Sequence, residues 1–244
     1  MFIVYNKPKK ILYLEGLNVV MVYDIIRKII YKFLLLPTKL KNKYALRRDV
    51  MEETENEILS NERKTEIENI ASNIRKEYNL LTVDFDLIEF LNTIFSFEIQ
   101  NRMIEDDTTG LLLVDDNNLI PESTSNRVIV INQKLINDDE FMQKRRFICA
   151  HELGHFILHK KDQSVFAKRE TKIKKSLIEQ EAEYFAYCLL MPRKAIEILY
   201  TSPTTKILQN IYNESIIDIV SNVFNVSKKK ATQRLMDLGH IKNA

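Results

Sequence analysis

Glycine, proline and cysteine are scarce in this 244-residue chain. Four glycines and five prolines leave few interruptions for helices, so the composition predicts a mostly helical protein. The two cysteines, Cys149 and Cys188, exclude a disulfide framework and a Cys-x-x-Cys metal site. We interpret them as buried thiols of a reduced, cytoplasmic protein. No low-complexity tract is present, and 45% hydrophobic with 29% charged residues is an ordinary globular composition.

Long uncharged apolar runs are also missing. Residues 11–36 are rich in Ile, Leu, Val and Tyr, but a membrane-spanning helix needs roughly 20 almost uncharged residues. Five charged residues interrupt this run: Glu15, Asp24, Arg27, Lys28 and Lys32. We expect a small hairpin followed by an amphipathic helix that packs on the protein or on a partner, with peripheral membrane contact less favoured. No small-residue cleavage site follows, so a signal peptide is not expected.

Charge is distributed unevenly, although the net charge is only +2. Residues 1–50 hold eleven Lys or Arg and three Asp or Glu, a net of +8, so the remainder sums to −6. An acidic stretch over 52–57 follows. The pattern predicts a basic N-terminal extension over 1–50 that is joined to a separate body, and no chemistry is readable in the extension.

The body alternates helical and strand patterns. Apolar residues at helical spacing predict helices over 60–78 and 84–94, each beginning near a Ser, Asn or Asp cap. Alternation of polar and apolar residues predicts a strand at 96–100, and apolar, β-branched runs predict strands at 109–114 and 127–132. Asn137, Asp138 or Asp139 is expected to cap the next helix. This order predicts an α+β fold, mostly helical, with a small antiparallel sheet packed on that next helix.

Residues 151–155 read His-Glu-Leu-Gly-His, which is the strongest chemical signal in the chain. On a helix, His151 and His155 lie one turn apart on the same face, where both can bind one divalent metal ion. Glu152 then stands beside a metal-bound water as a general base. Gly154 weakens the helix by about 1 kcal/mol relative to alanine, which a closely packed partner would justify.

A catalytic zinc needs a third protein ligand. His159 is disfavoured as a ligand because eight residues of helix rise about 12 Å, whereas two ligand atoms on one zinc cannot be much more than about 4 Å apart. A helix over 176–191 is the better source. Ser176 and Glu179 form a capping box there, while Glu181 falls in the apolar sector, where a carboxylate is costly unless paired or coordinated. Glu181 is therefore the predicted third ligand, and this donor set favours zinc.

The runs HELGHFILH and, 26 residues after the second histidine, EAEYFAYCLLMP together resemble the ImmA/IrrE family of metallopeptidases. The likeness covers roughly residues 62–240. It implies His151, His155 and Glu181 as metal ligands and Glu152 as the catalytic base. It also implies a metallopeptidase domain over 51–200 and a helix-turn-helix-like unit over 201–244. Glu183 departs from the pattern, since the family often has Asn there, and the extension over 1–50 is not explained by it.

The resemblance implies a zinc endopeptidase that cleaves one intracellular protein, a helix-turn-helix repressor, although no residue identifies that target. Tyr184, Tyr187 and His159 are candidates for the donor that stabilises the oxyanion. Val128–Asn132 is a candidate edge strand for an extended substrate. The alternative is a non-proteolytic antirepressor or antitoxin-type binding protein with a structural metal. Glu152 argues against it, because binding alone has no use for a general base.

Residues 215–239 read as helix, Asn-Val-Ser turn and helix, with Ser227 as a cap and Gly239 just past the end. This resembles a helix-turn-helix unit. Its second helix carries four cations suited to phosphate contacts: Lys228, Lys229, Lys230 and Arg234. The favoured interpretation is that these helices complete the peptidase fold and help to dock a protein substrate. A DNA-binding regulator is the less favoured alternative, because the chain is nearly neutral.

Overall fold

A computed structural model describes residues 58–242 apart from 105–107, 116–119, 121, 137, 139, 160–176 and 213. The hairpin and helix predicted within 1–50 lie outside the described residues. The helices are α2 (Asn61–Glu77), α3 (Leu87–Phe95), α4 (Phe141–Leu158), α5 (Leu177–Leu190), α6 (Arg193–Thr201), α7 (Pro203–Tyr212), α8 (Ile216–Phe224) and α9 (Lys228–Asp237). The strands are β1 (Glu98–Arg102), β2 (Gly110–Val114) and β3 (Arg127–Asn132), and a short 3-10 turn, η1 (Gln133–Leu135), follows β3.

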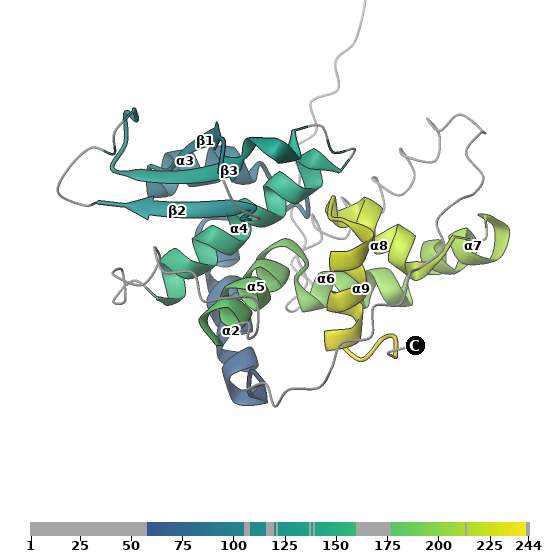
Figure 1. Ribbon diagram of the computed structural model, residues 1–244. Coiled ribbons are helices and arrows are strands. Elements are labelled where there is room, and N and C mark those ends of the chain that lie inside the picture. Colours follow the sequence, from purple (N-terminus) through teal and green to yellow (C-terminus); the bar gives the residue numbers. More distant parts are fainter. Residues whose placement is uncertain are drawn as a thin grey trace, which may run out of the picture.

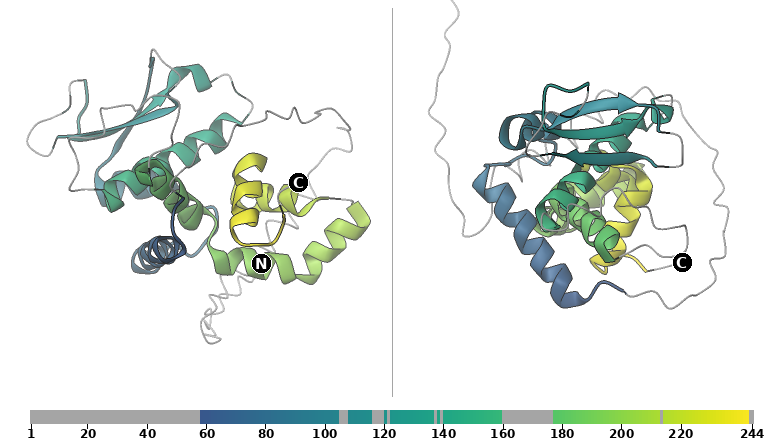
Figure 2. Two further views of the ribbon diagram at one scale, coloured as in Figure 1. Left: turned by 60° about the horizontal axis from the view of Figure 1, so that its bottom comes forward. Right: turned by 60° about the vertical axis from the view of Figure 1, so that its left-hand side comes forward.

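Helix α4 lies between the sheet and α5, and α2 packs along α5 (Figures 1 and 2). Helices α6 to α9 gather beyond one end of α5 (Figure 1). The prediction of a mostly helical α+β fold is confirmed. Because α4 and α5 are neighbours in the middle of the molecule, any side chains on their facing sides meet between two well-packed helices.

Local capping explains where several helices begin. The side chains of Ser60, Asp86, Ser215 and Ser227 each accept a hydrogen bond from the backbone three residues ahead. Helix α4 differs from its prediction, because its N-cap residue is Glu140, without a side-chain cap. Gly239 follows α9 at φ +75°, the left-handed conformation expected of a residue just past a helix end.

The sheet is mixed, which corrects the prediction of an antiparallel one. Strand β3 is central, with β1 parallel on one side and β2 antiparallel on the other. The chain leaves β1, forms β2 at the far edge and returns between them as β3. Strand patterns indicate which residues are extended but not the pairing direction. The prediction of an edge strand at Val128–Asn132 is wrong for the same reason, and β2 takes the edge position.

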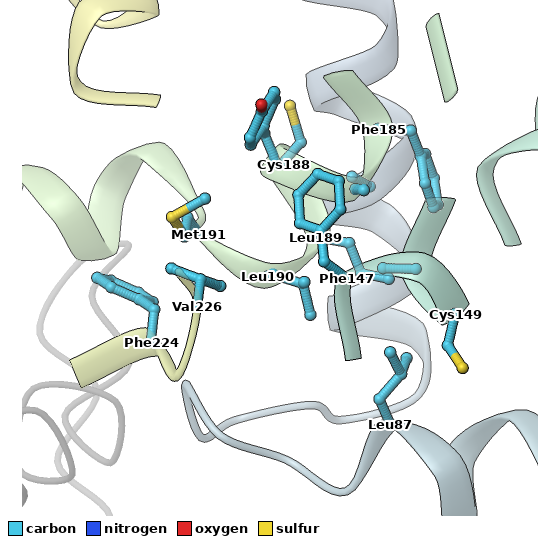
Figure 3. Packing of buried hydrophobic residues seen from close by; sticks show 14 of the residues in the cluster. Leu87, Phe147, Cys149, Phe185, Cys188, Leu189, Leu190, Met191, Phe224 and Val226 are labelled. Carbon is cyan, nitrogen blue, oxygen red and sulfur yellow. The ribbon is translucent and has the colours of Figure 1, made fainter. Parts of the chain in front are cut away.

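One hydrophobic core joins the helices on both sides of α5. Figure 3 shows Leu190 and Met191, at the end of α5, near Phe224 and Val226 from the turn between α8 and α9. Cys149 and Cys188 are free thiols within this core, as predicted. Among the helices of the described residues, none combines the length and apolar character that crossing a membrane requires.

Candidate metal centre

Helix α4 presents the two motif histidines on one side, one turn apart. The Nε2 atoms of His151 and His155 are 3.1 Å apart. The His155 side chain is 6% exposed and that of His151 is 18% exposed, so the pair lies at the rim of the core. The sequence prediction that these two side chains converge is confirmed by their geometry.

Helix α5 brings Glu179, and not Glu181, to the histidines. One carboxylate oxygen of Glu179 is 3.2 Å from Nε2 of His151, and the other is 3.2 Å from Nε2 of His155. The histidines hold the pKa of Glu179 far below its ordinary range through hydrogen bonds, which outweigh the effect of burial. The Glu179 side chain is 47% exposed, so this side of the cluster is open to solvent.

Glu181 occupies a different position from the one predicted. Its carboxylate accepts two hydrogen bonds from Arg63 of α2, from Nε at 2.9 Å and from Nη2 at 2.6 Å. His159, at the end of α4, is 3.0 Å from the same carboxylate. Burial alone would raise the pKa of Glu181, but the hydrogen bonds from Arg63 and His159 outweigh it and lower that pKa. The structure therefore brings Glu179 together with His151 and His155, whereas Glu181, the predicted third ligand, lies against Arg63 and His159.

The difference between the predicted and the observed neighbours of Glu181 has a physical reason. A carboxylate on the apolar side of a helix does need a partner, and Glu181 has one, but it is an arginine 118 residues earlier in the chain. The sequence pattern had assigned Glu179 to a capping box with Ser176. Ser176 lies outside the described residues. The sequence did contain one indication of Glu179, which is its position at the edge of the buried side of the helix. A catalytic metal needs access to solvent, so a half-exposed carboxylate fits it better than a fully buried one.

Gly154 explains how α4 and α5 come close enough for this meeting. A Cβ atom at Gly154 would lie 2.9 Å from the carbonyl oxygen of Ala182 and 3.1 Å from the ring of Phe185. Both neighbours belong to α5, so the closely packed partner expected at this glycine is present. Because Gly154 lies between the two histidines in sequence, the close contact sets the distance between them and Glu179.

Glu152 lies beneath the edge of the sheet. Its side chain is buried, and burial raises its pKa, with Glu179 adding to the shift and the two histidines opposing it. Strand β2 begins directly above it, because a Cβ atom at Gly110 would lie 3.2 Å from Oε1 of Glu152 and 2.3 Å from Ile148. A carboxylate with a raised pKa beside an open edge strand is suited to proton transfer near neutral pH.

The side chains considered as oxyanion donors are engaged elsewhere. The hydroxyl of Tyr184 donates to Glu68 of α2, and that of Tyr187 donates to Glu183. His159 contacts Glu181. Burial raises the pKa of both tyrosines. Tyr184 and His159 therefore join neighbouring elements, while Tyr187 is bound within α5. None of these three contacts reaches His151, His155 or Glu179.

The cluster of His151, His155 and Glu179 has the donor chemistry and spacing of a zinc site. Its two imidazole nitrogens and its carboxylate oxygen all lie within 4.8 Å of one another. Ligand atoms placed tetrahedrally around one zinc at about 2 Å would be about 3.3 Å apart, close to the 3.1 and 3.2 Å observed. The residues present therefore fit the metal, and the half-exposed Glu179 side chain places the cluster at the solvent-facing side of the two helices.

Comparisons with known proteins found a family model and two relatives that match this chain. A model of the IrrE N-terminal-like domain (Peptidase_M78) matches residues 106–236. Metallopeptidase ImmA of Bacillus subtilis (strain 168) is 29% identical over 112 residues, which are 46% of this chain and 61% of that protein. The uncharacterized immunity region protein 2 of Bacillus phage phi105 is 43% identical over 67 residues, 28% of this chain and 39% of that protein. The chain thus spans less than two thirds of either relative, and no solved structure matches it significantly.

Proposed function

Because this chain belongs to the family defined by the IrrE N-terminal-like domain, whose model matches more than half of it, we propose that it is a zinc-dependent endopeptidase. The observation that carries the proposal is the convergence of His151, His155 and Glu179, together with a buried Glu152 carboxylate near enough for the charges of all three to shift its pKa. A binding protein with a structural metal would gain nothing from such a carboxylate. The buried thiols are consistent with action in the cytoplasm.

In this proposal each residue has a separate task. His151, His155 and Glu179 hold the metal, which when bound supplies the positive charge that makes a water molecule acidic near neutral pH. Glu152 accepts the proton of the attacking water and delivers it to the amine of the departing peptide. Its raised pKa suits both steps, because a strongly acidic carboxylate would be a poor base.

Strand β2 is the proposed docking edge for the substrate backbone. Asn132 N–H donates to Thr109 C=O and Asp115 N–H donates to Asn126 C=O, so the odd-numbered residues of this strand pair with β3. The backbone groups of Gly110 and Leu112 then point to the free edge. An extended peptide paired there would pass directly above Glu152, because Gly110 lies against that carboxylate.

The proposed substrate is a helix-turn-helix repressor. The family resemblance implies this class of target, and the relative from Bacillus phage phi105 is described as an immunity region protein. A repressor presents a specific protein surface, so recognition would involve more than the strand at β2. Candidate repressors can therefore be tested directly as substrates beside an unrelated protein.

The test combines metal content with cleavage. We expect about one zinc per chain by plasma mass spectrometry in the wild type and in Glu152→Gln, and little in His155→Ala or Glu179→Ala. With zinc in excess, the matched variant Glu181→Gln should keep the wild-type stoichiometry. Wild type should create new amino termini in a candidate repressor, and Glu152→Gln should be slower by about 100-fold or more. A Glu152→Gln protein that still cleaves at the wild-type rate would disprove the proposed mechanism.

A further inference from the structure

We propose that Arg63 of α2 is a positioning residue that, through Glu181, holds the first turn of α5 so that Glu179 stays at the two histidines. The inference rests on the proposed function, because it concerns the same metal site. Arg63 does not contact the histidines or Glu179 in any described interaction. Its effect would be transmitted by the position of a helix.

Two contacts, one from α2 and one from the residue two places before its start, hold the two residues that follow Glu179. The Arg63 guanidinium binds the Glu181 carboxylate through two nitrogens, at 2.9 and 2.6 Å. The backbone N–H of Leu59 donates to the side-chain oxygen of Gln180 at 3.4 Å. A two-nitrogen contact of this kind fixes both distance and orientation, because the guanidinium and the carboxylate must be nearly coplanar.

Glu181 also connects α5 to the helix that carries the histidines. His159, which ends α4, lies 3.0 Å from the Glu181 oxygen that Arg63 Nη2 binds. The rings of His159 and His155 are 5.5 Å apart, so this contact is close to the metal cluster. One carboxylate therefore joins α2, α4 and α5 around the site, and its side chain is only 15% exposed.

The first turn of α5 has particular need of such ties. Glu179 is the third residue of α5, and helix ends open more readily than helix interiors. From Ala182 onward, α5 is anchored by buried apolar side chains and by the close contact with Gly154. Leu177, by contrast, is exposed, and Ile178 to Glu181 are only partly buried. Polar contacts to α2 thus fix the turn that carries the metal-binding carboxylate, where apolar packing is weakest.

The geometry separates this role from direct ligation. Residues 179 and 181 point in directions about 200° apart around a helix axis, so one meets the histidines while the other meets Arg63. Loss of Arg63 would leave all three metal ligands in the chain. It would also leave the Glu181 carboxylate without its cation, which favours displacement of the turn toward water. The expected defect is weaker metal binding with an unchanged number of sites.

The experiment is a zinc titration of the full-length protein against a chromophoric chelator. Arg63→Gln should bind one zinc per chain with an affinity lowered about 10-fold, the lower end of the range for residues that support metal ligands. Arg63→Lys keeps the charge without the two-nitrogen contact and should fall between Arg63→Gln and wild type. The matched control is Glu66→Gln, because Glu66 is the exposed second partner of Arg63, at 2.8 Å, and does not contact Glu181. It should bind zinc as tightly as wild type.

A purely structural role predicts a different result. Thermal unfolding of the metal-free proteins measures stability, and a structural tie alone would lower the melting temperature of Arg63→Gln while leaving its zinc affinity unchanged. Wild-type affinity in a folded Arg63→Gln or Arg63→Lys protein would overturn the proposal. If instead wild type binds no zinc, or Glu179→Gln retains full affinity, the proposed metal site itself fails. The two failures are therefore distinguishable in one titration series.

Discussion

At the scale of single residues, Gly154 determines how closely the two central helices approach. Because Gly154 has no side chain, the backbone of Ala182 can approach it closely. A Cβ atom at Gly154 would be only 2.9 Å from the carbonyl oxygen of Ala182. Glu179, three residues before Ala182, is brought to His151 and His155 by the same contact. The proposed metal cluster is thus supported by a glycine that offers no ligand atom, and the role of this glycine is the spacing of the helices.

We expect Gly154→Ala to weaken zinc binding about 10-fold and to destabilise the metal-free protein by roughly 1–3 kcal/mol. Backbone atoms of α5 must move, although alanine favours a helix over glycine by about 1 kcal/mol, which offsets part of the loss. Urea unfolding and zinc titration measure both effects. Gly239→Ala is the control: at φ +75° with open space around it, alanine should cost about 1 kcal/mol without changing zinc affinity. A Gly154→Ala protein with wild-type zinc affinity would contradict this explanation.

At the scale of elements, α9 is attached to the rest of the described protein by basic side chains. The sequence pattern had suggested these side chains for phosphate contacts. Arg234 is fully buried, donates to the carbonyl of Met191 and lies 3.0 Å from Glu68. Lys230 donates to Glu183 at 2.6 Å and lies over the ring of Phe147. Lys228 pairs with Asp218 of α8. Glu183, the departure from the family pattern, thus has a partner on α9, and these contacts favour a structural role for the C-terminal helices.

Removing the Arg234 cation should destabilise the protein markedly. We expect Arg234→Met to lower the free energy of unfolding by about 3 kcal/mol, the lower end of the range for breaking a buried ion pair. The lower end applies because Arg193 also binds Glu68. Urea unfolding measures the change, and the exposed Lys229→Ala should stay within about 0.5 kcal/mol of wild type. A stable Arg234→Met protein that instead loses affinity for duplex DNA would favour the DNA-binding interpretation.

At the scale of the whole molecule, one core extends from α2 to α9, and both cysteines lie inside it. Cys149 is completely buried and Cys188 is 4% exposed. Burial raises the pKa of each thiol to about 12, so almost no reactive thiolate forms near neutral pH. The two thiols therefore report on opening of the core from two different helices.

We expect a thiol reagent at pH 8 to label both cysteines slowly and at the same rate, because each needs the shared core to open. Mass spectrometry of the labelled peptides measures the two rates separately. Protein unfolded in urea should label at once, and zinc should slow both rates in the folded protein, because a ligand of the native state opposes opening. Faster labelling of Cys188 would show instead that α5 opens independently of the rest of the core.

The sequence by itself determined the features that depend on neighbouring residues in the chain. Ser227 was identified as a helix cap, and Ser60 as one of two candidates for another, because capping joins residues three apart. His151 and His155 were placed on one side of a helix by their spacing alone. The three strands were recognised from alternating or continuous apolar residues. Membership of the family followed from the same local motifs.

Only the tertiary structure decided which neighbour each side chain meets. Helical spacing gives the angle between Glu179 and Glu181 around α5. It does not show that α4 lies beside Glu179 and Arg63 beside Glu181. The parallel pairing of β1 with β3 and the inward direction of Arg234 likewise depend on segments distant in the chain. Local spacing constrains one element at a time. A metal site or an ion pair between elements depends on how several elements pack together. The spacing of residues within one element does not determine that packing.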